Sequence, residues 1–266
     1  MKSDMSSILN TLEPVGLGPA GPKWQQRKSS QTRVAILEAA IHCLERHGYA
    51  QTTMQLIAEV AKISRGAMTH HYASKLELIS AVIDYLFYRR VAIFEKKIGS
   101  LTDKQRIVEN LGIEQAWEAY FTREHKAYLE LIVAARTDVE LQQVFLPKAQ
   151  RYDRLWRAEN ARIFPEWRDK PDLLECAIDF VQAALEGLVL NSPIWNNSTR
   201  EAVFRAFLAD IMRKLRDGEL KLPTRRESEK FRSSAPDSEK TIPRSVAPKP
   251  GQIATQVTKT PRQRAK

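Results

Sequence analysis

From Gln31 to Gly218, apolar residues recur every three or four positions, and no segment shows the strict alternation of a half-buried strand. This spacing puts apolar side chains on one face of each of several successive helices, and it therefore predicts an all-α fold. After residue 98 we expect helices near Asp103–Thr122, Arg123–Arg136, Val139–Phe164, Asp172–Asn191 and Thr199–Asp217.

The helices at the N-terminal end of this region are the best defined. A first helix from about Gln31 to His47 ends at Gly48, and two short helices and a long one follow, with a three-residue turn, 62–64, between the short ones. That order is typical of a helix-turn-helix motif. The expected helix caps are Thr52 with Gln55, Ser64, Ser74 with Glu77, and, for the last helix of the chain, Ser198 with Glu201.

Composition divides the chain into four parts. We expect residues 1–28 to be a flexible arm, 29–80 to contain the helix-turn-helix motif, 81–218 to form a second helical domain, and 219–266, with six prolines, to be a disordered tail. Of the net charge of +10, residues 23–98 carry 12 basic and 6 acidic groups, and residues 219–266 carry 12 and 5. Basic ends around a nearly neutral middle favour a polyanionic partner.

Other classes of protein are disfavoured. The two cysteines, Cys43 and Cys176, do not make a disulfide framework, and no secretory signal or membrane-spanning run is present, so we expect a cytoplasmic protein that does not interact with a membrane. A glycine-rich phosphate loop and a nucleophile elbow are both missing, which argues against an enzyme. Because the adjacent His70 and His71 do not face one side of a helix, no metal and no cofactor are expected.

A fixed pattern of residues runs through the helix-turn-helix segment: Ile36, Leu37, Ala39, Ala40, Gly48, Tyr49, Thr52, Thr53, Ile57, Ala58, Ala61, Ser64, Gly66, Ser74, Lys75 and Leu78. With this pattern, about fifty residues resemble the TetR family of bacterial transcriptional regulators. Three positions depart from the family pattern: Lys62 replaces a glycine in the turn, Thr69 replaces a tyrosine, and Tyr72 replaces a phenylalanine. If position 62 is left-handed, its lysine costs about 1 kcal/mol.

The resemblance implies double-stranded DNA as a partner. A recognition helix enters the major groove with its first residues nearest the base edges, which makes Arg65, Ala67, Met68 and His70 candidates for groove contacts. Arg65 either pairs with guanine or holds a phosphate. Lys75 begins the long helix beside free backbone amides and is expected to bind phosphate. The remaining candidates are Arg33, Thr52, Thr53, Gln55, Ser64 and Gly66, together with Thr69, His71 and Tyr72, which contact phosphate or pack against the motif.

The last two helices are apolar over most of their circumference, so each must be covered on more than one side. We expect an identical chain to cover one side, as in the family, although a larger core within one chain would also satisfy the pattern. The expected interface residues are Leu174, Ile178, Val181, Leu185, Phe204, Phe207 and Ile211.

A pocket for a small-molecule effector is expected among the middle helices, although aromatic stripes are more often ordinary core. The resemblance implies a homodimeric repressor that an unidentified effector releases from a palindromic operator. An activator, or an architectural DNA-binding protein without an effector, remains an alternative. The candidate pocket residues are Trp117, Tyr120, Phe121, Tyr128, Leu131, Phe145, Tyr152 and Trp156.

Overall fold

The computed structural model describes residues 6–14, 24–99, 102, 105, 112–224 and 227–229, and over these ranges its regular structure is entirely helical. The predicted all-α fold class is therefore confirmed. None of the helices in the described ranges combines the length and apolarity that a membrane span requires. The helices are α1 (Ser6–Leu12), α2 (Trp24–Gln51), α3 (Met54–Val60), α4 (Arg65–His71), α5 (Lys75–Gly99), α7 (Ile113–Tyr120), α8 (Arg123–Ala134), α9 (Val139–Ile163), the 3₁₀ turn η1 (Pro165–Trp167), α10 (Pro171–Trp195) and α11 (Ser198–Asp217).

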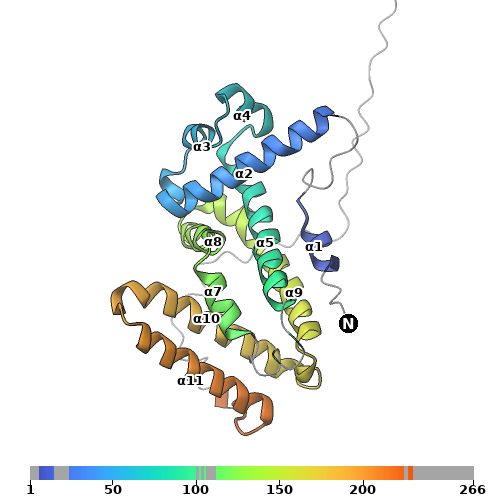
Figure 1. The fold of residues 1–266 in the computed structure, drawn as a ribbon, viewed down its shortest axis with the longest axis vertical. Coiled ribbons are helices and arrows are strands. Elements are labelled where there is room, and N and C mark those ends of the chain that lie inside the picture. Colours follow the sequence, from blue (N-terminus) through green and yellow to red (C-terminus); the bar gives the residue numbers. More distant parts are fainter. Residues whose placement is uncertain are drawn as a thin grey trace, which may run out of the picture. The chain divides into compact units, whose positions relative to one another are not determined.

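The chain divides into two compact units, residues 1–222 and 223–266, and all of these helices belong to the first unit. Within it, α3 and α4 lie at one end and α10 and α11 lie side by side at the other, while α5 and α9 run between them (Figure 1). In the second unit, the backbone amide of Ser228 donates to the carbonyl of Thr224 across 2.9 Å. Most of the expected tail lies outside the described residues.

The first core cluster joins the helix-turn-helix motif to helices from the second half of the chain. Ile57 of α3 and Met68 of α4 share this cluster with Leu131 of α8 and Phe145 of α9, and all four side chains are buried. Helix α5 passes through the expected domain boundary at residue 80 without a break. The motif therefore packs on the helical domain as part of one continuous core.

The second core cluster fills the opposite end of the unit. Leu185 of α10 and Met212 of α11 pack there with Val91 of α5. Part of the expected flexible arm also contributes, because residues 6–12 form helix α1 and bury Ile8 and Leu12 in this cluster. The sequence analysis missed α1 because a helix of only two turns carries a weak periodic signal.

Gly48 ends the regular part of α2, as predicted. Its φ of 72° lies in the region that favours glycine, and the chain turns there before α3. A Cβ at this position would come within 3.0 Å of the Glu130 carboxylate on α8. The backbone angle therefore favours glycine where α2 crosses α8, whereas the flexible Glu130 side chain could shift to make room for a Cβ.

Candidate nucleic-acid interface and internal cavity

Side-chain caps hold α3 and α4 in the helix-turn-helix arrangement. Ser64 Oγ accepts a hydrogen bond from Ala67 N across 3.1 Å, which confirms the predicted cap of α4. Lys62 in the turn has a φ of 55°, so this lysine occupies the left-handed position where the family pattern has glycine. The motif pays about 1 kcal/mol in backbone strain for that residue.

The predicted cap of α3 is wrong by one residue. Thr53, not Thr52, accepts the hydrogen bond from Leu56 N, across 3.1 Å. Thr52 is buried, and its hydroxyl donates to the carbonyl of Gly48, so it is not available to DNA. Gln55 donates to Glu59 on its own helix instead of closing a capping box. The chain turns at Gly48 and places Thr52 inside, a detail that spacing alone does not specify.

Two further caps follow the prediction only in part. Ser74 accepts from Glu77 N as expected, while the Glu77 carboxylate accepts from Ala73 N, across 2.8 Å. Asn197, rather than Ser198, caps α11 by accepting from Arg200 N. Glu201 accepts a hydrogen bond from the Ser192 hydroxyl, so the proposed box at that helix does not form.

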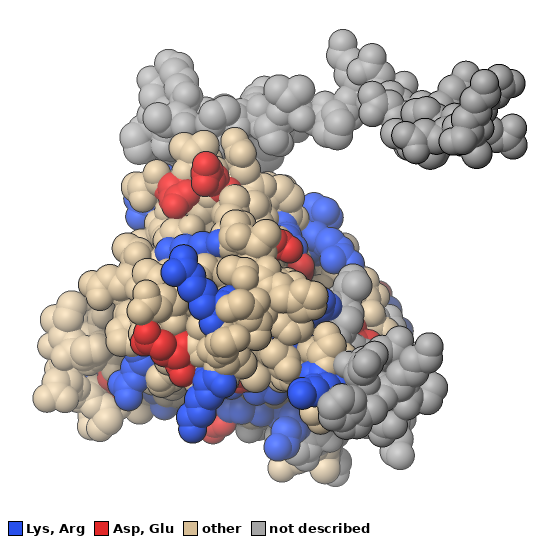
Figure 2. Space-filling view, turned by 90° about the horizontal axis from the view of Figure 1, so that it is seen from above, with Lys and Arg blue, Asp and Glu red and all other residues tan. Residues whose placement is uncertain are grey.

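The first turns of α4 present a polar exposed face. Arg65, Thr69 and His70 are exposed on it, with Ser64 and Gly66 beside them, while Ala67 is half-buried. Thr53 and Gln55, at the start of α3, are exposed as well. Seen from the end where α4 lies, Lys and Arg side chains are spread over the surface with fewer Asp and Glu between them (Figure 2). This face offers donors and positive charge to a polyanion.

Two candidate DNA contacts are core residues instead. The side chain of Met68 is 1% exposed and packs in the first core cluster, so its prediction as a groove contact is wrong. Tyr72 is also buried there, which assigns it to packing rather than to phosphate. On a helix of two turns one face must cover the core, and position 68 belongs to that face.

Arg33 lies near the C-terminal end of α4, and its charge helps to lower the pKa of His71. Burial lowers the pKa of His71 below its ordinary value, and the positive charges of Arg33 and His70 lower it further. Half-buried His71 is therefore mainly neutral at pH 7, and it can act as a hydrogen-bond donor or acceptor but not as a cation.

Lys75, the expected phosphate ligand, makes contacts inside the protein. Its Nζ donates to the carbonyl of Tyr49 across 2.8 Å and lies 4.1 Å from the centre of the Tyr49 ring. Burial lowers the pKa of Lys75, and the nearby charge of Asp138, the N-cap of α9, opposes that shift. Lys75 thus connects the start of α5 to the end of α2.

A cavity of about 110 Å³ opens between α5, α7, α8, α9 and α10. Four of the predicted pocket residues line it: Tyr120, Tyr128, Tyr152 and Trp156. A second hollow shares five lining residues with it, namely Phe94, Ala116, Tyr120, Trp156 and Gln182. Aromatic side chains from four helices therefore enclose one internal space.

Four other predicted pocket residues lie elsewhere. Leu131 and Phe145 are buried in the first core cluster, toward the helix-turn-helix motif. Trp117 packs edge-on against exposed Phe121 and lies 4.7 Å from the Arg205 guanidinium. Helical spacing identifies an apolar face, but it does not separate the part of that face that fills the core from the part that borders a cavity.

The sequence analysis missed the polar lining of the cavity. Arg90, His125 and Gln182 all border it. A signal was present for Arg90, because Phe87, Arg90 and Phe94 follow each other at spacings of three and four. A charged residue on an otherwise apolar helix face is an unusual feature and indicates a site.

The expected dimer residues on α10 turn out to be core residues. Leu174, Ile178, Val181 and Leu185 are all buried within the chain in the second core cluster, so their assignment to an interface is wrong. On α11, Ile211 is half-buried, whereas Phe204 and Phe207 are exposed, Phe207 by 64%. Helix α10 is apolar on two sides, as expected. Leu174, Ile178, Val181 and Leu185 lie on the side that packs against the chain's own core.

A different set of α10 residues is exposed. Its members are spaced alternately four and three positions apart, as along the seam of a coiled coil, and only the glycine among them is half-buried. A Cβ on that residue, Gly187, would meet nothing within 4 Å, so nothing within the described chain requires a glycine there. This α10 stripe consists of Cys176, Phe180, Ala183, Gly187, Leu190 and Ile194.

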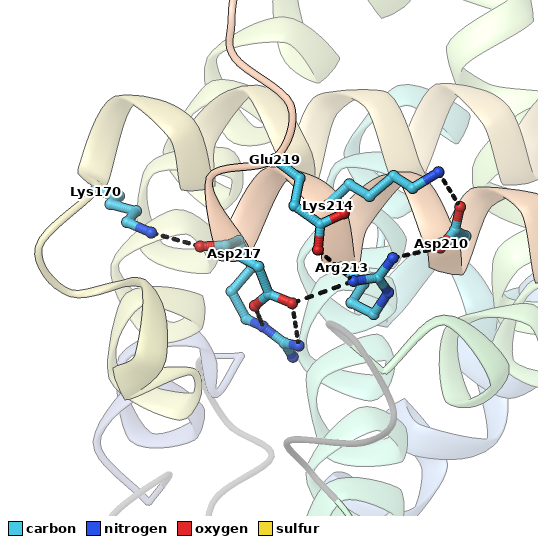
Figure 3. A network of polar contacts seen from close by, with 7 residues as sticks. Lys170, Asp210, Arg213, Lys214, Asp217 and Glu219 are labelled. Atoms are coloured by element: carbon cyan, nitrogen blue, oxygen red, sulfur yellow. Dashed lines mark hydrogen bonds and ion pairs between the residues drawn. The ribbon is translucent and has the colours of Figure 1, made fainter.

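Ion pairs fix the end of α11. Arg213 contacts Asp210 at 2.9 Å and Glu219 at 2.8 Å, and Lys214 contacts Asp210 at 2.8 Å (Figure 3). Lys170, just before α10, donates to the carbonyl of Arg216. Hydrogen bonds from Lys214 and Arg213 lower the pKa of Asp210. Single surface pairs contribute little, but together these contacts order the last turn of α11 beside the start of α10.

The fold and the exposed face of α4 define a helix-turn-helix protein with an attached helical domain that contains a cavity. Residues 36–82 match the model of the bacterial regulatory proteins of the tetR family. The match covers the helix-turn-helix segment and not the helical domain that follows it.

Curated relatives match only part of this chain, and the chain spans less than two thirds of their own length. The regulator CymR of Pseudomonas putida is 27% identical over 119 residues, 45% of this chain and 58% of CymR. TtgR of Pseudomonas putida is 39% identical over 61 residues, 23% of this chain and 29% of TtgR. Among solved structures, GusR of Salmonella enterica has the same fold, with a TM-score of 0.54 and 21% identity over 71% of this chain and 96% of GusR.

Proposed function

We propose that this chain is a homodimeric transcriptional regulator that binds a palindromic DNA site and acts as a repressor that a small molecule releases. The observation that carries the proposal is the exposed face of α4. Arg65, Thr69 and His70 are exposed together there, on a helix whose first turn Ser64 caps, inside the segment that matches the family model. A capped helix of this kind fits the major groove with its N-terminal residues toward the bases.

The α10 stripe and the exposed residues of α11 support a dimer. Ile194 is 78% exposed, and Val203 and Phe207 are both 64% exposed, so a considerable apolar surface faces solvent in the single chain. Exposed apolar patches of this kind mark interaction sites. A two-fold axis through α10 and α11 would present two copies of α4 to one side of DNA, separated by about 34–36 Å for successive major grooves.

The connection between cavity and DNA face supports release by a ligand. Helix α5 begins at Lys75 beside the motif and carries Arg90 and Phe94 into the cavity lining, about 22 Å further along the helix at 1.5 Å per residue. A ligand that favours one position of α5 would change the separation of the two α4 helices in a dimer. Regulation requires only that the ligand bind the two dimer shapes with different affinity.

The direct test selects duplexes from a randomised pool with the purified full-length chain and measures the mass of the complex. We expect a two-fold symmetric sequence bound by two chains. Selection of a site without symmetry, or one chain per duplex, would contradict the dimer. No enrichment over random duplex at low salt would contradict sequence-specific DNA binding itself. A reporter placed behind the selected site distinguishes a repressor from an activator.

A further inference from the structure

Arg90 puts a positive charge into the cavity wall; Glu186 lies close enough to interact with this charge, but no described carboxylate forms an ion pair with the guanidinium. Its guanidinium carbon lies 4.1 Å from the centre of the Tyr128 ring and 5.6 Å from that of Tyr152. Its Nη1 is buried, and no hydrogen-bond acceptor for it exists among the described residues. Arginine remains charged even when buried, and a buried donor without an acceptor is costly. The arrangement therefore leaves room for an acceptor that the described part of the protein does not supply.

His125 adds a second polar group to the lining, and both His125 and Arg90 lie beside the Tyr128 ring. Its side chain is 1% exposed, and neither ring nitrogen has a hydrogen-bond partner within the described ranges. The imidazole lies 4.1 Å from the centre of the Tyr120 ring. Burial, with a smaller effect of the Arg90 charge, lowers the pKa of His125 to about 2. The ring is thus neutral at pH 7 and carries one N–H donor.

The acids around the cavity already have partners. Asp153 lines the cavity but pairs with Arg157 at 2.9 Å. Glu124, next to His125, pairs with Arg89 at 3.1 Å. Glu186 accepts a hydrogen bond from Gln182; burial raises its pKa, and the nearby charge of Arg90 opposes that shift. A single negative charge therefore balances Arg90, whereas a dianion would face the neighbouring Asp153 and Glu186 without a second cation in the lining.

The other walls are aromatic. Phe94 packs edge-on against Trp156 with ring centres 4.7 Å apart, and Tyr152 stacks on Trp156 at 6.1 Å. The cavity of about 110 Å³ continues into the adjoining hollow of about 60 Å³. Since an apolar cavity of about 150 Å³ admits benzene, this space has the size of a single substituted ring.

We propose that the cavity binds a small monoanionic aromatic carboxylate, whose carboxylate oxygens accept hydrogen bonds from Arg90 and His125 while its ring packs against Phe94, Tyr152 and Trp156. The assignment of this compound as the effector rests on the proposed function; the assignment of its chemistry rests on the cavity. A guanidinium holds a carboxylate through two parallel hydrogen bonds, and the aromatic walls exclude water from that contact.

The experiment measures binding by titration calorimetry on the full-length protein. The probes are benzoate and 4-methylbenzoate, the two matching carboxamides, benzylamine and hexanoate. We expect both aromatic carboxylates to bind, and the carboxamides and benzylamine to bind roughly 100-fold more weakly, since a buried site that pairs a charge rejects analogues that lack it. Hexanoate should bind more weakly than benzoate because it cannot stack.

Variants assign the contact. Arg90→Met should lose roughly 100-fold in benzoate affinity, and His125→Phe should lose less, since its donor is neutral. The matched control is Arg154→Met, which removes an exposed arginine from α9 beside the lining residue Asp153 and should leave the affinity unchanged. If Arg90→Met does not fold, Arg90→Lys keeps the charge without the two-pronged geometry, and its benzoate affinity should fall about tenfold.

The inference is overturned if carboxamides or benzylamine bind as tightly as the acids, if Arg90→Met keeps wild-type affinity, or if no aromatic carboxylate binds at millimolar concentration. Parallel titrations on the selected duplex separate this result from the proposed function. Carboxylate binding that depends on Arg90 but leaves DNA affinity unchanged would support the ligand chemistry and contradict effector release. Specific DNA binding without carboxylate binding would support the DNA-binding function and contradict the ligand chemistry.

Discussion

The hydroxyl of Tyr85 donates a hydrogen bond to Glu38 Oε1 across 2.5 Å, and this contact joins α5 to α2. Arg123 at the start of α8 pairs with the same carboxylate, and Arg89, one helical turn after Tyr85, pairs with Glu124 of α8. Burial and the adjacent Glu38 raise the pKa of Tyr85, so its hydroxyl stays protonated. The network thus fixes three helices where the motif meets the cavity.

Tyr85→Phe removes one bond of this network and keeps the ring. We expect the free energy of unfolding to fall by about 1–3 kcal/mol, because Glu38 loses a donor in a mostly buried setting. Urea denaturation of wild type and variant measures the change. The control is Tyr88→Phe on the same helix, at a half-buried position, which should change stability less. Equal losses in the two variants would assign the effect to the ring environment rather than to Glu38.

Lys62→Gly should stabilise the protein. Lys62 has a φ of 55°, and glycine adopts this conformation without the clash that a Cβ creates. The expected gain is about 1 kcal/mol, reduced somewhat by the greater freedom of glycine in the unfolded chain. Ala92→Gly, in the interior of α5, provides the opposite control and should cost about 1 kcal/mol. A loss of stability in Lys62→Gly would show that the lysine side chain makes a contribution larger than the strain.

His125 should make the protein less stable in acid. Its pKa is lowered to about 2 in the folded state from an ordinary 6.5, by burial first and then by Arg90, and the rings of Tyr120 and Tyr128 also face it. Between these pH values the unfolded chain binds more protons. The free energy of unfolding therefore falls as the pH drops from about 6.5 toward 2, by up to about 1.4 kcal/mol per unit from this one group.

His125→Phe tests that dependence in urea melts from pH 7 to pH 4. The slope of the free energy of unfolding against pH should decrease relative to wild type by the contribution of one bound proton, up to about 1.4 kcal/mol per pH unit. His42→Gln changes an exposed histidine on α2 and should leave the slope as it is. An unchanged slope in His125→Phe would mean that His125 is not buried in its neutral form.

Leu190→Glu should produce monomers. Leu190 is 61% exposed in the α10 stripe, so a glutamate there does not disturb the chain's own core, whereas two copies of it would meet across a two-fold interface. Sedimentation equilibrium measures the mass. The control Val139→Glu changes a residue that is 65% exposed at the start of α9 and should leave the dimer intact. Equal masses for Leu190→Glu and wild type would place the interface elsewhere.

Arg65→Ala separates base recognition from phosphate binding. If Arg65 pairs with guanine, affinity for the selected duplex should fall by about 1–3 kcal/mol, with little change on random duplex. Arg168→Ala, an exposed arginine just after η1, controls for the loss of one charge. Equal losses on both duplexes would assign Arg65 to a phosphate instead.

Sequence alone predicted the order of the helices from α3 onward and the caps Ser64 and Ser74, because apolar faces and these caps are local features, but it missed α1 and the caps of α3 and α11. Ser64 was identified as the cap of α4, and α8 to α11 begin within one residue of the expected positions. The details that failed depend on tertiary packing. The side chains of Thr52 and Met68 are buried rather than exposed to DNA. Leu185, expected at a dimer interface, is buried in the chain's own core. The sequence of a helix that is apolar on two sides does not indicate which side packs against its own chain.

The shared core cluster of α3, α4, α8 and α9 limits how this protein can be re-engineered. The helix-turn-helix segment shares its core with the helical domain, because Ile57 and Met68 belong to the same cluster as Leu131 and Phe145, and α2 packs along α8. A chimera that transplants residues 29–80 onto another body would have to carry over these partner surfaces too. Exchanging the DNA specificity of such a protein is therefore better done by replacing exposed residues of α4 one at a time than by grafting the whole motif.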